Sequence, residues 1–213
     1  TNVGSIPSVV TDGENGMFVP VKDVDSIVFA IKAFDNSLIT EKSEETLIVR
    51  DGVIQPDLKK DVVKIALVNR YGGNNITNGF IKGFNLKKGA FGASVSHDSH
   101  NILVIGTNSE DMAKVVNIIR ERQGGLVAYS SEEDVCEVLE LPIAGLMSNK
   151  DIDYVADKNR KLSAAVNKLG CNLTSPFTTL SFMALITIPH FKISDQGLFD
   201  ADKLKFIDLI HNF

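Results

Sequence analysis

The sequence predicts an α/β or α+β fold: a mixed β-sheet with two main helices packed on it, and a small αβ appendage at the N-terminus. Short runs rich in Val, Ile and Leu recur between residues 62 and 140, as in buried strands. Two stretches, 107–121 and 151–169, carry apolar residues at three- and four-residue intervals, which indicates helices. The 213 residues, 44% of them hydrophobic, suffice to bury a sizeable core.

The N-terminal residues 1–36 predict the appendage. A polar turn at "TDGENG" precedes the short apolar strand "MFVPV". The next segment, "KDVDSIVFAIKAF" (22–34), predicts a helix, because its apolar residues share one helical face; they are Val24, Ile27, Val28, Ile31 and Phe34. The segment "DNSLITEKSEE" (35–45) predicts a linker. A strand, a turn at Asp51-Gly52 and a second strand are predicted after it. Residues 37–57 are together assigned to this linker and hairpin.

The strands of the main sheet follow from residue 62 onward. Each predicted strand is a short apolar run bounded by Gly, Asn or Ser. The runs are "VVKIALVNR" (62–70), "ITNGFIKGF" (76–84), "GAFGASVS" (89–96), "NILVIGT" (101–107), "LVAYSS" (126–131) and "DVCEVLELP" (134–142).

Two helices complete the prediction. Thr107 and Glu110 fit a capping box, and Gly124-Gly125 ends the helix that follows; its buried side would be Met112, Val115, Val116 and Ile119. Ser148 and Asp151 would cap the second helix, which Gly170 ends; its apolar side would be Ile152, Val155, Leu162, Val166 and Leu169. The apolar, irregular remainder, "FTTLSFMALITIPHFKISDQGLFD" (177–200), predicts a last strand and packing loops.

The composition excludes several classes of protein. The net charge of −5 argues against a general nucleic-acid binder, which needs a basic surface. No apolar run approaches the roughly 18 residues that span a membrane, and the N-terminus does not resemble a signal peptide. Cys136 and Cys171 form no CxxC pair, so we expect a reducing, cytoplasmic setting.

Several stretches carry a family resemblance. They include "VRDGVIQPDLKKDVVKIALVNRY", "GFIKGFNLKKGAFGASVSHDSHNILVIGTNSEDMAKVVN", "LELPIAGLMS" and "LGCNLTSPFTTLSFMAL". Residues from about 47 to 205 thereby resemble the C-terminal domain of bacterial adenine deaminase, of the amidohydrolase superfamily. One departure is Tyr71, where the family usually has a histidine after the arginine.

The resemblance implies a function for the complete enzyme. Such an enzyme hydrolyses adenine to hypoxanthine and ammonia in purine salvage, with a dinuclear Mn or Fe centre in a (β/α)8 barrel N-terminal to this domain. That barrel begins with an HxH pair, whereas this chain has four histidines and no HxH. We therefore expect no cofactor in this chain and no adenine deamination by the chain alone. Its implied partner is the catalytic barrel, on which it would pack and whose access it would shape; a homo-oligomer is left open.

Residues 1–34 resemble a different family, the closing part of the nucleotide-sugar-binding domain of GT-B glycosyltransferases. The paired-glutamate motif of that family would lie upstream of Thr1. The predicted division is therefore a glycosyltransferase-like fragment (1–36), a linker and hairpin (37–57), and an adenine deaminase C-terminal-like domain (58–213). Two alternative functions are a non-catalytic binding or assembly module and a glycosyltransferase remnant.

The candidate site is "SVSHDSHN" (94–101), between two predicted strands. Residues three apart on a strand point to opposite faces, and no further ligand is spaced nearby, so we predict no metal site from His97 and His100. One hypothesis is that the turn reaches the barrel's active site, where either histidine contacts substrate or orients a ligand and Asp98 fixes a tautomer.

The other hypothesis, which the pattern favours, is a structural turn in which Asp98, Ser99 and Asn101 bond nearby backbone groups. Arg70, at the end of a predicted strand, is a further candidate contributor that would bind an anion or pair with Asp98; the alternative, which the pattern favours, is a salt bridge at the strand end. No residue of this set is assigned a catalytic role from sequence.

Overall fold

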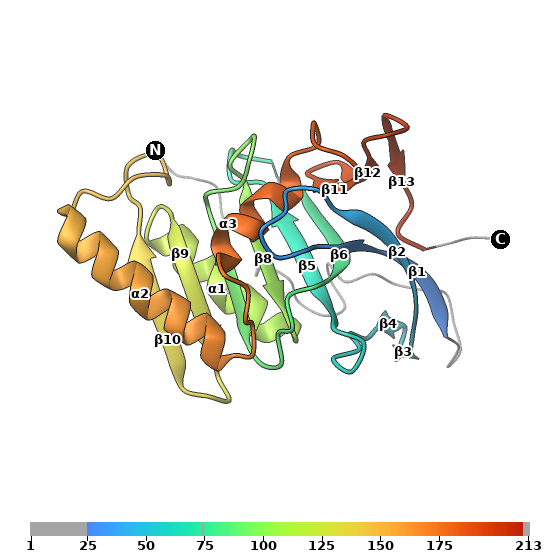
Figure 1. Cartoon of the computed structure of the whole chain (residues 1–213), viewed down its shortest axis with the longest axis horizontal. Helices are drawn as coiled ribbons and strands as arrows, with labels where there is room; N and C mark the ends of the chain where they lie inside the picture. Colours follow the sequence, from blue (N-terminus) through green and yellow to red (C-terminus); the bar gives the residue numbers. More distant parts are fainter. Residues whose placement is uncertain (1–24, 74, 211–213) are drawn as a thin grey trace.

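Eight strands form one mixed sheet in the computed structural model of the protein, which describes residues 25–73 and 75–210 (Figure 1). Neighbouring strands are antiparallel except for β1 and β6, which run parallel. The strand order is β10 (Val135–Glu140), β9 (Gly125–Ser130), β7 (Ala90–Ala93), β8 (Ile102–Gly106), β5 (Val62–Val68), β6 (Ile76–Lys82), β1 (Ser26–Lys32) and β2 (Glu41–Leu47). The predicted α/β or α+β class with a mixed sheet is confirmed.

Both faces of the sheet are covered. On one face lies α1 (Ser109–Glu121), and on the other lie α2 (Ile152–Lys168), α3 (Pro176–Ser181) and the 3-10 turn η1 (Phe182–Ala184). A three-stranded sheet of β11 (Phe191–Ser194), β12 (Gly197–Asp200) and β13 (Lys205–Ile207) packs beside β6 and β1. No helix within residues 25–73 and 75–210 has the length and apolar character to cross a membrane.

The central strand β5 shows why this arrangement is stable. All seven of its residues are buried, because successive side chains point to opposite faces. Ile65 and Leu67 enter the core beneath α2 and α3, whereas Ala66 and Val68 enter the core beneath α1. The strands predicted from residue 62 onward are confirmed at 62–68, 76–82, 90–93, 102–106, 125–130 and 135–140.

The helix predicted over 22–34 is wrong for residues 26–32, which form β1. Its apolar residues match a helical face, but the uninterrupted run Ile27–Ile31 is also what a strand buried on both faces requires. Phe29 packs into one core and Val28 into another. Residues 22–24, the turn at 11–16 and the strand at 17–21 lie outside the described residues.

The linker predicted over 35–45 is also wrong at its C-terminal end, where β2 begins at Glu41. β2 is the edge strand next to β1 and reads "EKSEETL". Charged side chains protect an exposed edge from pairing with other chains, and they also hide the strand from an apolar-pattern search. β1 lies before the boundary predicted at residue 36 and pairs with β2 and β6 in the main sheet.

The hairpin predicted around Asp51-Gly52 is confirmed. It consists of β3 (Val49–Arg50) and β4 (Val53–Ile54). Both turn residues have positive φ, 50° and 78°, as a two-residue type I′ hairpin turn requires.

The two predicted helices are confirmed with one correction to their caps. The N-cap of α1 is Asn108, whose Oδ1 accepts the backbone N–H of Asp111 at 2.7 Å. The predicted Thr107–Glu110 box is therefore one residue out of register, and the Thr107 hydroxyl instead donates to the Gly89 carbonyl. The α1 residues expected in the core are buried: Met112, Val115, Val116 and Ile119.

In α2 the predicted cap and part of the predicted apolar side are correct. Asp151 Oδ1 accepts the N–H of Tyr154, and Gly170 follows the helix with a φ of 105°. Leu162, Val166 and Leu169 are buried, and Val155 packs partly buried against the same core. Ile152 is the exception, because 77% of it is exposed.

The C-terminal stretch 177–200 contains the strands β11 and β12, which bears out a last strand there. The helix α3 and the turn η1 were not predicted. Pro176 stands in the first turn of α3, where proline is well tolerated.

A fully buried lysine lies in β11. Lys192 Nζ donates to the Leu38 carbonyl at 2.8 Å, and the residue has no exposed surface. Burial lowers the pKa of Lys192 to about 8, from 10.5. The lysine thereby fastens the loop before β2 to the small sheet, and its burial favours the neutral amine.

This lysine should give the protein a pH-dependent stability. Between pH 8 and 10.5 the unfolded chain binds more protons at Lys192 than the folded chain, so the free energy of unfolding rises with pH there. The slope is at most about 1.4 kcal/mol per pH unit. Urea denaturation from pH 7.5 to 10.5 should show this rise for the native chain relative to Lys192→Met. Lys59→Met, at an exposed lysine, controls for the lost charge, and an equal slope in both variants would contradict the assignment.

Candidate functional site

The predicted site residues gather at one edge of the sheet. Residues 94–101, here named the histidine turn, connect β7 to β8. β7 and β5 are each antiparallel to β8, so they run in the same direction and end at the same edge. Residues 69–71, which follow β5, therefore lie beside the histidine turn, and Figure 1 shows the two connections next to each other.

The first half of the turn is built on buried serines. Ser94 Oγ donates to the Gly145 carbonyl at 2.6 Å and accepts the N–H of Gly125 at 2.9 Å. It thereby connects β7, β9 and the loop after β10. Ser96 is equally buried, yet its Oγ has no hydrogen-bond partner among the described residues.

The second half of the turn closes on itself. The N–H of His100 donates to the Ser96 carbonyl at 2.7 Å, and the N–H of Ser96 donates back to His100 Nδ1 at 3.3 Å. The N–H of His97 donates to the Ser181 carbonyl at 2.9 Å, which ties the turn to the end of α3. His100 has a φ of 55°, a conformation that costs a non-glycine residue roughly 1–2 kcal/mol, so these contacts must hold it.

Arg70 holds the outer side of the turn. Its Nε donates to the His100 carbonyl, its Nη2 donates to the Ala144 carbonyl at 2.7 Å, and its backbone N–H donates to Asn101 Oδ1 at 3.2 Å. The predicted pairing of Arg70 with Asp98 is wrong, and so is the salt bridge at the strand end, since no ion pair of Arg70 occurs within residues 25–73 and 75–210 and Asp98 is exposed. The physical reason is geometric: Nε and Nη2 of the guanidinium point to backbone carbonyls of two loops.

Tyr71 continues this support from the next position. Its hydroxyl donates to the Ser99 carbonyl at 2.7 Å, and the Arg70 guanidinium lies 4.8 Å from the centre of its ring. Asn101, fully buried, donates from Nδ2 to Ser99 Oγ at 3.1 Å. Of the three polar residues expected to satisfy backbone groups, Asn101 does so, by accepting the N–H of Arg70.

The environment of His100 fixes its protonation. Burial lowers the pKa of His100, and the positive charges of His97 and Arg70 lower it further, against a smaller opposing effect of Asp98. Because Nδ1 accepts the Ser96 N–H, the neutral ring carries its proton on Nε2. The tautomer of His100 is thus set by a backbone N–H, and a role of Asp98 in fixing the tautomer of His97 stays a prediction. In its neutral form, His100 therefore has the Nε2–H as its hydrogen-bond donor.

His97, like His100, is partly buried. Its ring lies 4.7 Å from the ring of Phe182 and 5.4 Å from that of His100, measured between centroids. Phe182 belongs to η1 and was not among the predicted site residues. Nothing in the sequence places η1 beside the histidine turn, because residues 102–181, which separate them, include the sheet strands β8, β9 and β10 and both main helices.

The histidine turn does not fit a manganese, iron or zinc ion. It offers two imidazoles, and Nδ1 of His100 already accepts a backbone N–H. Metal sites in proteins use three or more protein ligands, and no cluster of three His, Cys, Asp or Glu side chains that could hold a metal occurs in the described part of the chain. Elsewhere, His190 Nδ1 lies 2.6 Å from Asp202 Oδ2, and His211 lies outside the described residues.

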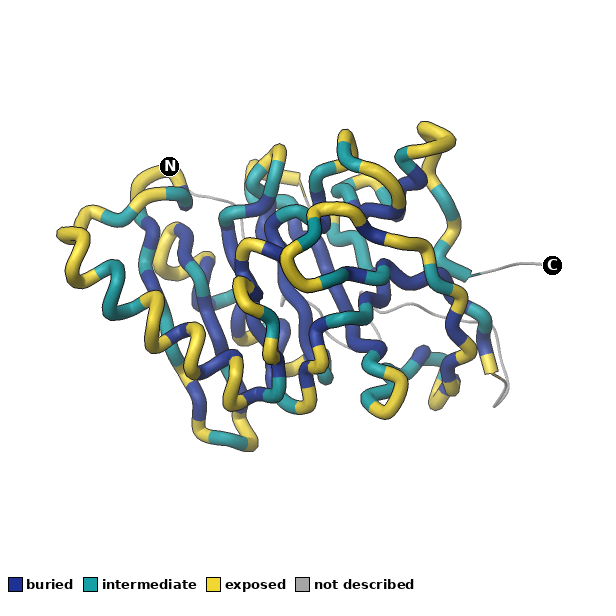
Figure 2. The backbone as a smooth tube through the Cα atoms, in the orientation of Figure 1, coloured by how far each residue is buried: buried dark blue, intermediate teal, exposed yellow. Residues whose placement is uncertain are grey.

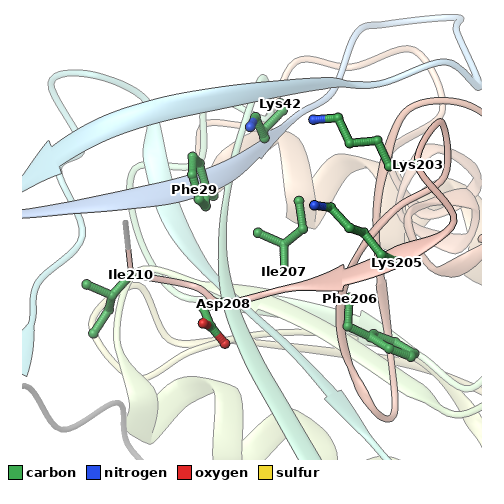
Figure 3. A pocket seen from close by; sticks show the side chains of 8 residues that line it. All are labelled: Phe29, Lys42, Lys203, Lys205, Phe206, Ile207, Asp208 and Ile210. Atoms are coloured by element: carbon green, nitrogen blue, oxygen red, sulfur yellow. The ribbon is translucent and has the colours of Figure 1, made fainter. Parts of the chain in front are cut away.

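A cavity of about 350 Å³ lies apart from this edge, beside β1, β2 and β13 (Figure 3). Its lining includes Phe29, Lys42, Lys203, Lys205 and Phe206, and in Figure 3 the two lysines near β13 point toward β1 and β2. None of the predicted site residues lines it. The predicted site residues that the structure brings together are those of the histidine turn and Arg70.

The two buried serines of the turn give a matched test. Ser94→Ala leaves a buried carbonyl and a buried N–H without their partner, so we expect it to lower the free energy of unfolding by about 1–3 kcal/mol. Ser96→Ala removes a hydroxyl that has no partner, so we expect a change within about 0.5 kcal/mol, or a gain. Urea denaturation of both variants measures the difference, and equal losses would contradict the assigned hydrogen bonds.

The protonation of His100 is testable by nuclear magnetic resonance. Long-range ¹H–¹⁵N spectra should show the proton on Nε2 of neutral His100, and its pKa should lie below 6.5. His97→Gln removes one of the nearby positive charges, so the pKa of His100 should rise. A proton on Nδ1, or a lower pKa in the variant, would refute this account of the turn.

Comparison with known proteins gives the family. The adenine deaminase C-terminal domain model matches residues 37–205. An adenine deaminase of Methanosphaera stadtmanae is 48% identical over 180 residues, which cover 84% of this chain and 33% of that relative.

Two further relatives agree. The adenine deaminase of Methanothermobacter thermautotrophicus is 42% identical over 186 residues, with 87% of this chain and 34% of the relative covered. That of Brucella anthropi is 48% identical over 179 residues, 84% of this chain and 32% of the relative. The chain spans about a third of the length of these relatives, and the glycosyltransferase resemblance of residues 1–34 finds no support in them. The chain belongs to the adenine deaminase C-terminal domain family.

Proposed function

We propose that this chain serves as the C-terminal part of a cytoplasmic adenine deaminase, which hydrolyses adenine to hypoxanthine and ammonia for purine metabolism. The observation that carries the proposal is the similarity over 84% of this chain to about a third of each relative. The remaining two thirds or so of such an enzyme would hold the catalytic barrel and its manganese or iron. The described residues of this chain do not fit such a metal, so no step of the reaction is assigned to them.

In this proposal the histidine turn faces the catalytic barrel. Arg70 and Tyr71 donate to backbone carbonyls of the turn, so its shape is fixed before any partner binds. The Nε2–H of neutral His100 and the ring of His97 are then left for contacts with the barrel or with a purine nitrogen. A pre-organised donor of this kind orients a partner at little entropic cost.

The alternative, a turn with a purely structural role, is favoured by its many internal hydrogen bonds. The two hypotheses differ in one respect. A structural turn needs the backbone contacts of residues 96–100 and the Nδ1 of His100, which accepts the Ser96 N–H, whereas a turn that contacts the barrel or substrate needs the Nε2–H of His100 and the ring of His97.

The first test concerns catalysis by the chain alone. We expect the purified chain, supplied with manganese or iron, to release no ammonia from adenine. Residues 37–213 grafted in place of the corresponding third of the Methanosphaera stadtmanae adenine deaminase should give an active enzyme. Ammonia release by the chain alone would contradict the proposal, and so would a folded graft without activity.

The second test concerns the imidazoles of the turn in that grafted enzyme. We expect His100→Asn, whose amide oxygen can take the place of Nδ1 as the acceptor, to lower kcat/KM for adenine by about tenfold, since a hydrogen-bond partner left unsatisfied in a closed site costs about 1–3 kcal/mol. His190→Asn, at an exposed histidine, is the matched control. Unchanged kinetics in His97→Ala and His100→Asn would leave the histidine turn a structural role.

A further inference from the structure

The helix α2 carries buried residues in only one of its halves. Its buried residues are Leu162, Ala165 and Val166, all in its C-terminal half. Each of the first three residues of the helix, Ile152 to Tyr154, is exposed, and Ile152 has 77% of its surface accessible. In Figure 2 the N-terminal end of α2 carries exposed and intermediate residues beyond the buried strands. Because packing of an apolar side supplies most of a helix's stability, this end of α2 has a surface suited to a partner.

The loop before α2 extends that surface. Ile143 and Met147 are 46% and 56% exposed. Each donates its N–H to the carbonyl of the other at 3.1 Å, so the loop is held in one shape. The two side chains are therefore presented to solvent from a backbone of defined shape.

The same loop is joined to the histidine turn. Ser94 Oγ donates to the Gly145 carbonyl, and Arg70 Nη2 donates to the Ala144 carbonyl. The guanidinium of Arg70 also lies against the ring of Tyr71, which is 61% exposed while its hydroxyl is satisfied by Ser99. Tyr71, Ile143, Met147 and Ile152 thus lie along one edge of the molecule and are here named the apolar shelf.

We infer that the apolar shelf is the surface on which the rest of an adenine deaminase chain docks. The inference rests on the proposed function and adds the location of the contact. The curated relatives carry about two thirds of their length outside the part that matches this chain, so a partner of sufficient size belongs to the same polypeptide. The shelf is hydrogen-bonded to the histidine turn, so a partner seated on it also reaches His97 and His100.

Hydrogen exchange locates the contact directly. In the Methanosphaera stadtmanae enzyme carrying the grafted residues 37–213, backbone amides of residues 143–155 should exchange at least about tenfold more slowly than in the isolated chain. Amides of residues 201–205, at the other end of the molecule, should exchange equally in both proteins. A folded graft without added protection at 143–155 overturns the inference. A folded graft that is protected there but inactive contradicts the proposed function alone.

Paired substitutions give an independent test. Met147→Glu with Ile152→Glu should lower adenine deamination by the grafted enzyme by about tenfold or more. The control is Ile48→Glu with Leu204→Glu, at residues with 55% and 79% exposure, and it should leave activity unchanged. Equal activity of the two double variants overturns the inference.

The same variants in the isolated chain separate docking from folding. Both double variants should melt within about 2 °C of the native chain, because exposed positions contribute little to stability. A much larger loss in Met147→Glu with Ile152→Glu alone would show that the shelf packs within this chain, which overturns the inference. A native dimer that this variant converts to a monomer would show a second copy on the shelf, with the same consequence.

Discussion

Burial of the main sheet on both faces is the constraint on which the rest of this structure depends. All seven residues of β5 are buried, which requires that α1 cover one face of the sheet and that α2, α3 and η1 cover the other. Polar side chains that cannot be satisfied inside such a sheet collect where strands end. The histidine turn, Arg70 and the loop after β10 all lie at one of these edges, and they are held there by hydrogen bonds to each other rather than by a metal or a disulfide.

A single positively charged group, the guanidinium of Arg70, connects two loops at this edge by donating to carbonyls of both. It has no carboxylate partner among residues 25–73 and 75–210. Its positive charge, together with burial, favours the neutral form of His100. A neutral imidazole with a defined tautomer is a directional donor at neutral pH, which is the feature that distinguishes this turn from an ordinary polar connection.

The sequence predicted the strands from residue 62 to 140 and both main helices because their apolar residues recur with a single period. The prediction failed for residues 26–32, whose apolar residues fit a helical face and a strand buried on both faces equally well. It also failed for β2, because that strand is charged. The histidine turn was found from its composition, but its partners were not. Phe182 and Ser181 meet it only through packing of α3 against β7, and Arg70 was expected to pair with a side chain although backbone carbonyls lay closer. The helical spacing of Ile152 predicted a place on the apolar side of α2. The structure exposes this residue instead, as part of the apolar shelf.

We infer that the rest of an adenine deaminase chain docks on this edge of the domain. An experimental structure of the complete Methanosphaera stadtmanae enzyme tests it most directly, through the accessible surface of the positions equivalent to Tyr71, His97, Met147 and Ile152. The account predicts that these positions are buried against the part of the enzyme that this chain does not match. If they face solvent there while another surface of the domain is covered, the account is contradicted.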